Sequence, residues 1–426
     1  MIRKEFPKLG EHYFEERLPN GLLVRVMEKP GFAKRYAFVA TDYGSIDAEF
    51  LQDGVHYKTP QGVAHYLEHE MFDLPEGNAM QAFAKYAGAN NAFTSYTMTA
   101  YYVECTEHFE ENFDILLRMV TTGYFTEESV QKERGIIAQE IKMYDDSADS
   151  AVMENLFRLM YQNHPVRNPI AGTVESIQDI TAETLNLCHK TFYDPSNLIV
   201  CVIGDVDAQV VIDQVRRRTP EGKPEKIERC YGAPEPETAQ TRRIEKEMEI
   251  SMPAFAIGFR CPDAGRGPEA MRMDLIGELA GEILIGESSV LYQKLYDENI
   301  IDADFSVDYE RMKGMALLEL SGDSEQPEAV LQAVLQQAQR VVREGVDHAL
   351  LKRLVKSITG RRLRELDGFE GTCYRMCAYY FDGAEYLDYP DIYAGVTAQD
   401  VEQFIRENVK EDKAFLSVIK PKGEKE

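Results

Sequence analysis

Residues 62–69 have the sequence GVAHYLEH, in which His65 and His69 stand four positions apart and Glu68 lies between them. On an α-helix, positions i and i+4 lie one above the other on the same face, so both imidazoles can bind a single ion. Glu68 is three residues from one histidine and adjacent to the other, so its carboxylate can point at a water molecule on that ion. The stretch therefore predicts a helix that carries two metal ligands and a general base.

A second helix is predicted over residues 126–145. Thr126 suits its N-cap, and acidic residues fill its first turn, where they complement the helix dipole. Glu133 and Glu140 are seven residues, or two turns, apart, so they share a face of this helix. Two histidines need another protein ligand to form a catalytic zinc site, and a carboxylate from a neighbouring helix is the usual third. Either glutamate can supply it, with the fourth position left open for water.

The stretch between these two helices predicts a pair of strands. Residues 90–105, NNAFTSYTMTAYYVEC, are rich in Thr and Tyr and poor in helix-forming residues. We therefore expect two adjacent strands here.

Length and composition indicate a globular protein of more than one domain. A chain of 426 residues is long for a single core. The net charge of −26 disfavours nucleic acid as a partner, because phosphates would be repelled. The chain has no apolar run long enough for a membrane span, and no apolar segment follows the basic residues at the start, so we expect neither a membrane partner nor a signal peptide.

The cysteines favour a reducing compartment. The seven are scattered along the chain and odd in number, which suits reduced thiols in the cytoplasm better than a disulfide framework. Cys373 and Cys377 are four residues apart, but no second ligand pair or histidine lies near them in the sequence. We interpret both as ordinary buried cysteines.

A weak internal repeat divides the chain into two similar α/β halves. Residues beginning at Thr181 predict a helix that leads to the strand at 198–203, and residues beginning at Thr397 predict the same pair of elements near the end of the chain. Thr181 and Thr397 are 216 residues apart, as are Val202 and Val418. An internal duplication is the simplest explanation.

The predicted halves are residues 1–218 and 244–426. Residues 219–243 are rich in Pro, Gly and charge, a composition typical of a linker. The second half has a single histidine, His348, so it cannot repeat the metal site. We expect it to form a substrate wall or a subunit interface.

These motifs together resemble the pitrilysin/insulinase family of zinc metallopeptidases, whose HxxEH order defines the inverzincins. Within that family the length and layout resemble the small bacterial members of the processing-peptidase type. The resemblance covers nearly all of residues 10–420 and is stronger in the first half. The motifs that carry it are residues 62–69, residues 91–95, Glu133 to Glu140, His164-Pro165 and residues 194–197.

The resemblance implies one Zn²⁺ per chain, bound by His65, His69 and Glu140. It assigns Glu68 as the catalytic base. It gives Glu133 the role of a residue that contacts a metal ligand without binding the metal itself.

The resemblance also implies a fold and a mode of substrate binding. We expect an α+β protein of two similar halves, each a mostly antiparallel sheet packed with helices, which close as a clamshell around a peptide. Asn91, Ala92 and Phe93 fall on an edge strand whose backbone pairs with an extended substrate.

One departure from the family pattern bears on function. Peptide-cleaving members carry an Arg and, seven residues later, a Tyr in the second half, and these positions fall on Tyr296 and Ala303. A donor that would polarise the substrate carbonyl is therefore missing. In two-subunit relatives one chain carries the zinc and the other carries the Arg/Tyr pair.

We therefore expect a zinc-dependent endopeptidase that is the zinc-bearing subunit of a heterodimer with a homologous partner. One alternative is a homodimeric peptidase that uses another donor, such as Tyr292, Tyr296 or Tyr309. The other alternative is a non-catalytic scaffold or peptide-binding subunit with the same fold.

Overall fold

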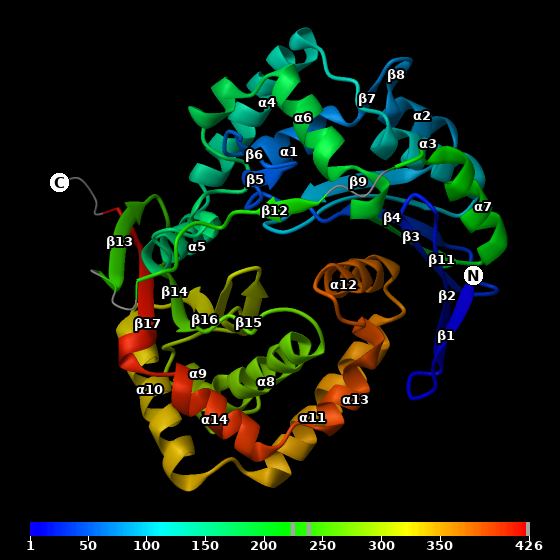
Figure 1. Cartoon of the computed structure of the whole chain (residues 1–426). Helices are drawn as coiled ribbons and strands as arrows, with labels where there is room; N and C mark the ends of the chain where they lie inside the picture. The colour runs from blue at the N-terminus through cyan, green and yellow to red at the C-terminus, as the bar shows by residue number, and fades with distance from the viewer. Residues whose placement is uncertain (223–225, 237–238, 240, 423–426) are drawn as a thin grey trace. The chain divides into compact units, whose positions relative to one another are not determined.

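The computed structural model of the protein describes residues 1–222, 226–236, 239 and 241–422. Its contacts divide the chain into two compact units, each assembled from several stretches of sequence. The first unit comprises Met1–Ile141, Asn168–Tyr231 and Leu363–Leu387. The second comprises Lys142–Arg167, Gly232–Arg362 and Asp388–Glu426. Each unit has a mostly antiparallel sheet packed with helices, which confirms the predicted α+β class (Figure 1).

The sheet of the first unit has seven strands in the order β1-β2-β3-β11-β4-β10-β9. Its pairs are antiparallel except for β3 with β11. Strand β9 lies at the edge and pairs with β10, as predicted for residues 90–105. The strands are β1 (Ile2–Phe6), β2 (Glu11–Arg17), β3 (Leu23–Glu28), β4 (Arg35–Thr41), β9 (Ala89–Thr94), β10 (Thr99–Cys105) and β11 (Leu198–Gly204).

The helices of the first unit build its core against this sheet. Helix α1 contacts β9, β10 and α6, and its Tyr66 and Leu67 are fully buried. The helices are α1 (Val63–Glu70), α2 (Ala79–Lys85), α3 (Phe109–Thr121), α4 (Glu127–Asp145, whose last turn is assigned to the second unit), α6 (Ala182–Phe192), α7 (Ala208–Arg218) and α12 (Phe369–Phe381). Short strands complete the unit: β5 (Glu49–Gln52), β6 (Val55–Lys58), β7 (Asp73–Leu74), β8 (Gly77–Asn78) and β12 (Ile227–Arg229).

The sheet of the second unit has five strands in the order β13-β17-β14-β16-β15. These are β13 (Arg243–Met248), β14 (Ala254–Cys261), β15 (Ser306–Met312), β16 (Met315–Asp323) and β17 (Ala414–Pro421). Its helices are α5 (Ala148–Met160), α8 (Pro268–Ile285), α9 (Val290–Asp297), α10 (Pro327–Glu344), α11 (His348–Glu365, up to Arg362), α13 (Tyr389–Ala394) and α14 (Ala398–Asn408). In the described part of the chain, each helix is too short or too polar to cross a bilayer.

The two sheets repeat one topology. Strands β3-β11-β4-β10-β9 correspond in order to β13-β17-β14-β16-β15. Among the described strands, each of these sheets has one parallel pair, and the two pairs occupy equivalent positions: β3 with β11, and β13 with β17. Val202 on β11 lies opposite Ala37, and Val418 on β17 lies opposite Phe255 at the matching position. The predicted internal duplication is therefore confirmed.

Two helices pack on the sheet of the other half of the sequence. Helix α5 packs on β13, β14 and β17, whereas α12 packs on β4 and β11 (Figure 1). Gly258 on β14 gives α5 room, because a Cβ there would lie 2.5 Å from Sδ of Met160. On the other sheet, Sγ of Cys377 on α12 lies 3.4 Å from Sγ of Cys201 on β11. Cys373 and Cys377 are fully buried, as the sequence predicts.

The contact-based units thus differ from the predicted halves, 1–218 and 244–426, in two segments. Residues 142–167 lie in the second unit, and residues 363–387 lie in the first. The physical reason is that each half contributes one helix to the sheet of the other half.

The segment predicted as a linker, residues 219–243, is partly built into the units. Residues 223–225, 237–238 and 240 lie outside the described residues. Strand β12 pairs with β5, and Arg229 forms ion pairs with Asp42 at 3.1 Å and Asp47 at 3.0 Å. In the second unit, Glu235 accepts hydrogen bonds from the backbone N–H groups of residues 162–164. Strand β12, Arg229 and Glu235 therefore attach parts of this segment to the two units.

Candidate metal centre

Helix α1 begins where only glycine fits. Gly62 is its N-cap with a φ of 88°, a conformation that L-residues with side chains rarely adopt. A Cβ at this position would lie 2.4 Å from the carbonyl oxygen of Ala171. The close approach of the Ala171 segment therefore fixes the start of the helix that carries both histidines.

The two histidines and one glutamate that the resemblance implies as ligands lie close together. His65 and His69 lie on α1, and Glu140 reaches them from α4. The Nε2 atom of His65 lies 3.7 Å from Glu140 Oε1, and Nε2 of His69 lies 3.3 Å from Oε2. One ligand atom from each residue falls within 4.8 Å of the other two. Within the described residues, this is the one such group of His, Cys, Asp or Glu that could hold a metal ion.

Helix α4 is held against α1 by buried and hydrogen-bonded contacts. The hydroxyl of Tyr66 donates to the carbonyl of Val130, and Ser129 Oγ donates to Glu70 Oε2 at 2.8 Å. Ile137 is fully buried, but the neighbouring Ile136 is 50% exposed, so one of the two isoleucines between Glu133 and Glu140 faces the core. These contacts place the acidic face of α4 beside the histidines.

Glu133 orients His69. Its Oε1 lies 2.8 Å from Nδ1 of His69, which leaves Nε2 for a metal. Burial lowers the pKa of His69, but the hydrogen bonds to Glu133 and Glu140 outweigh it and raise the pKa to about 10. Two imidazoles and a carboxylate, one imidazole supported by a further carboxylate, form a donor set that zinc accepts.

Glu68 is 8% exposed and lies on the same helix as the two histidines. Burial raises the pKa of its carboxyl group, and a hydrogen bond from Thr94 opposes this effect. The Thr94 hydroxyl donates to Glu68 Oε2 at 2.6 Å. The sequence predicted no role for Thr94, because its contact with Glu68 depends on how the strand end packs on the helix.

Asn91, Ala92 and Phe93 lie on the edge strand β9, which pairs with β10 on one side. The backbone N–H of Ala92 donates to Oδ1 of its neighbour Asn91 at 2.9 Å. The Phe93 ring lies 5.8 Å from that of Tyr374 on α12, a neighbour that the sequence could not indicate. Thr94 at the end of β9 joins this strand to the candidate base.

His164, which belongs to the His164-Pro165 motif, has a structural role in the second unit. It is 4% exposed, and its Nε2 donates to the carbonyl of Lys313 at 2.8 Å while Nδ1 accepts from the N–H of Val166. Burial lowers its pKa, so the neutral form is favoured. Both ring nitrogens of His164 therefore have hydrogen-bond partners within the second unit.

The tyrosines considered as alternative donors have different surroundings. Tyr296 on α9 is 47% exposed, and its ring stacks on that of Tyr292 at 6.1 Å. The ring of Tyr309 on β15 fills the space that the missing side chain of Gly277 leaves. Tyr309 is therefore half-buried against helix α8, and Tyr296 is the most accessible of the three.

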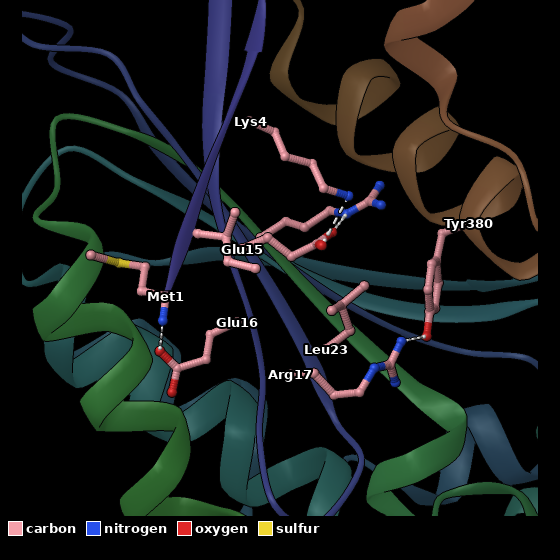
Figure 2. A pocket seen from close by; sticks show the side chains of 9 residues that line it. Met1, Lys4, Glu15, Glu16, Arg17, Leu23 and Tyr380 are labelled. Carbon is pink, nitrogen blue, oxygen red and sulfur yellow. Dashed lines mark hydrogen bonds and ion pairs between the residues drawn. The ribbon is translucent and has the colours of Figure 1, made fainter.

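A cavity of about 480 Å³ lies elsewhere in the first unit, between β1–β3 and Tyr380 of α12 (Figure 2). The cations on its wall already have partners. Lys4 forms an ion pair with Glu15 at 2.9 Å, and Arg17 donates to the Tyr380 hydroxyl at 2.9 Å (Figure 2). We assign this cavity no ligand.

Two sequence profiles match the chain. The family described as insulinase (peptidase family M16) matches residues 50–174, and the M16 peptidase inactive domain matches residues 179–358. The first match contains all of the candidate metal ligands. The second covers much of the half in which the sequence predicts no metal site.

Two relatives span nearly the whole chain, and a third matches about half of it. An uncharacterised zinc protease of Bacillus subtilis, YmfH, is 34% identical over 98% of this chain and 99% of its own length. The crystal structure of a peptidase described as M16-like from Alicyclobacillus acidocaldarius has a TM-score of 0.93 at 33% identity, over 99% of this chain and 100% of that one. An Arabidopsis thaliana protein named as subunit beta of the mitochondrial-processing peptidase is 28% identical over 47% of this chain and 37% of its own.

Proposed function

Because the chain belongs to the insulinase (M16) family of peptidases, we propose that it is a zinc-dependent endopeptidase whose metal is bound by His65, His69 and Glu140. The observation that carries this proposal is the convergence of three ligand atoms within 4.8 Å, beside the buried carboxylate of Glu68. The matched relative from Bacillus subtilis is itself named a zinc protease.

The chemistry follows from the side chains present. His65, His69 and Glu140 would hold the zinc, which would supply a Lewis acid for the scissile carbonyl and lower the pKa of a water molecule. Glu68 accepts the proton of the attacking water as the C–O bond forms, and delivers it to the amine nitrogen as the C–N bond breaks. During these steps Glu133 keeps the ring of His69 in place by its hydrogen bond to Nδ1.

The edge strand β9 is the proposed substrate platform. An extended peptide adds to such an edge through main-chain hydrogen bonds, which demand little of its sequence. The Asn91 side chain accepts a hydrogen bond from the N–H of Ala92. When a peptide binds, one of its carbonyl groups would accept this hydrogen bond instead. Substrate contacts by Asn91, Ala92 and Phe93 are part of the proposal.

The first experiment measures metal content and cleavage together. We expect about one zinc per purified chain by mass spectrometry, and cleavage of an unstructured peptide that Glu68→Gln abolishes while zinc is retained. Glu140→Gln should lose the zinc. A chain that binds no zinc would contradict the peptidase and favour the scaffold alternative, and near wild-type cleavage by Glu68→Gln would remove Glu68 as the base.

The missing Arg/Tyr pair suggests a two-chain enzyme. We propose that this chain is the zinc-bearing subunit and that a homologous partner supplies the donor, an arrangement that the subunit name of the Arabidopsis relative supports. Cleavage only after the partner is added would agree with this. Full activity of the chain alone would instead favour a homodimer with its own donor, of which Tyr296 is the most exposed candidate.

The cellular setting is also proposed. All seven cysteines are unpaired in the structure, which suits a reducing compartment such as the cytoplasm.

A further inference from the structure

The carboxylate of Glu68 is held by a single side chain. Thr94 Oγ1 donates to Glu68 Oε2 at 2.6 Å, and in the described part of the chain this is the one hydrogen bond found for the Glu68 side chain. Glu68 itself is buried, so this hydrogen bond lies inside the fold rather than in open solvent. A short hydrogen bond to an ionised carboxylate is among the stronger ones in proteins.

The backbone of Thr94 is fixed by the β9–β10 hairpin. Thr94 lies opposite Thr99 in the strand pair, and the following turn is closed by Ser95 N–H donating to the Met98 carbonyl at 2.8 Å. The Thr99 hydroxyl, 3.4 Å from that of Thr94, donates to the Tyr43 carbonyl at 2.9 Å. Threonine is also restricted at χ1 by its branched Cβ. The donor is therefore attached to a well-defined turn.

Thr94 also belongs to the strand that would carry the substrate. It follows Phe93 directly, at the end of the edge strand. One short hydrogen bond thus connects the proposed peptide platform to the proposed base.

We propose that Thr94 is a positioning residue that orients the Glu68 carboxylate for proton transfer. The proposal rests on the peptidase function proposed above and deepens it. With Oε2 engaged by Thr94, Oε1 is the oxygen left to accept the proton of the attacking water and to return it to the leaving amine. The same contact keeps Glu68 in a constant position relative to the peptide on β9.

The test compares two substitutions that differ in one hydroxyl. Thr94→Val keeps the shape but removes the donor, and Thr94→Ser keeps the donor. We expect Thr94→Val to lower kcat by about 10- to 100-fold, with KM, zinc content and Tm close to wild type, and Thr94→Ser to restore most of the activity. Thr97→Val, in the same hairpin turn, is the matched control and should leave kcat unchanged.

A binding measurement separates positioning from substrate contact. In the Glu68→Gln background, which does not turn over, the Kd of an uncleaved peptide should be the same with and without Thr94→Val. A tenfold weaker Kd, or a loss of zinc from Thr94→Val, would overturn the proposal, because Thr94 would then serve the substrate or the metal.

The outcomes also distinguish this inference from the function on which it rests. Wild-type kcat in Thr94→Val, in a chain that Glu68→Gln inactivates, refutes the positioning role and leaves the peptidase intact. A zinc-loaded wild-type chain that cleaves no peptide, with or without its partner, refutes the function itself and the positioning role with it.

Discussion

At the scale of single residues, Glu133 is expected to govern the strength of metal binding without being a ligand. Its Oε1 holds Nδ1 of His69 at 2.8 Å. Loss of such a support typically costs 10- to 100-fold in metal affinity, so we predict a zinc Kd weaker by about that factor for Glu133→Gln. Competition with a chelator measures it. Glu128→Gln, an exposed residue on the same helix, is the control, and equal affinities for the two variants would contradict the prediction.

Glu319 is expected to make stability depend on pH. Burial, and then the charge of Glu310, raise its pKa from 4.5 to about 8, and Asp308 lies directly opposite on β15. A carboxyl group whose pKa is raised by folding holds its proton more tightly in the folded state. Its stabilising contribution is therefore complete below pH 4.5 and is lost as the pH rises through 8.

Glu319→Gln, which stays neutral, should therefore resemble wild type near pH 4.5 and be more stable above pH 8. Since one pKa unit corresponds to about 1.4 kcal/mol and the side chain is partly exposed, we expect a gain of roughly 2 kcal/mol. Urea unfolding at both pH values measures it. The exposed Glu325→Gln serves as the control, and a gain that does not grow with pH would show that Glu319 is ordinarily ionised.

The sequence predicted which side chains share a helix face because helix geometry is local, and the family resemblance then chose Glu140 over Glu133 as the third candidate ligand. Spacings of four and seven residues place His65 with His69, and Glu133 with Glu140, on shared faces whatever surrounds them. The contact of Thr94 with Glu68 joins a strand end to a helix 26 residues away, and depends on how the hairpin packs on α1. No residue pattern specifies that distance, so only the structure could reveal it.

At the scale of elements, two glycines near the candidate metal centre should respond to alanine in opposite ways. Gly62 has a φ of 88°, and a Cβ there would lie 2.4 Å from the Ala171 carbonyl oxygen. Gly62→Ala should lower the free energy of unfolding by roughly 2 kcal/mol or more and weaken zinc binding, because α1 must shift. Gly135, inside α4, has no atom within 4 Å of such a Cβ.

Gly135→Ala should therefore stabilise the protein by about 0.5–1 kcal/mol, since alanine favours the helix. Thermal unfolding of both variants, with zinc content alongside, measures the contrast. A Gly62→Ala variant as stable and as rich in zinc as wild type would mean that the Ala171 segment can move aside without a loss of folding free energy.

The elements themselves were largely predictable, but their assignment to a sheet was not. The strands at 90–105 and the helix at 126–145 follow from composition, capping and periodicity, and the structure confirms both. An amphipathic pattern shows that α5 and α12 bury a face, but not which sheet covers that face. The predicted halves therefore miss that each half contributes one helix to the other unit, which the contacts show.

At the scale of the whole molecule, that exchange predicts that neither half folds alone. A fragment of residues 1–218 would lack α12, whose buried Cys373, Met376 and Cys377 belong to the first unit. The uncovered face of β4 and β11 would be an exposed apolar patch, which favours aggregation or a loosely packed state. We expect this fragment to bind a hydrophobic dye and to unfold without cooperativity.

The matched experiment breaks the chain without removing α12. A specific protease site inserted after Gly222 allows the folded protein to be cut within the segment that joins the sequence halves. Because each piece then retains a helix that packs on the sheet of the other, we expect the pieces to stay together in gel filtration and to keep their zinc. Separation of the cut pieces into two folded proteins would show that α5 and α12 contribute little. Cooperative unfolding of the 1–218 fragment would show that the sequence boundaries, and not the contacts, mark the folding units.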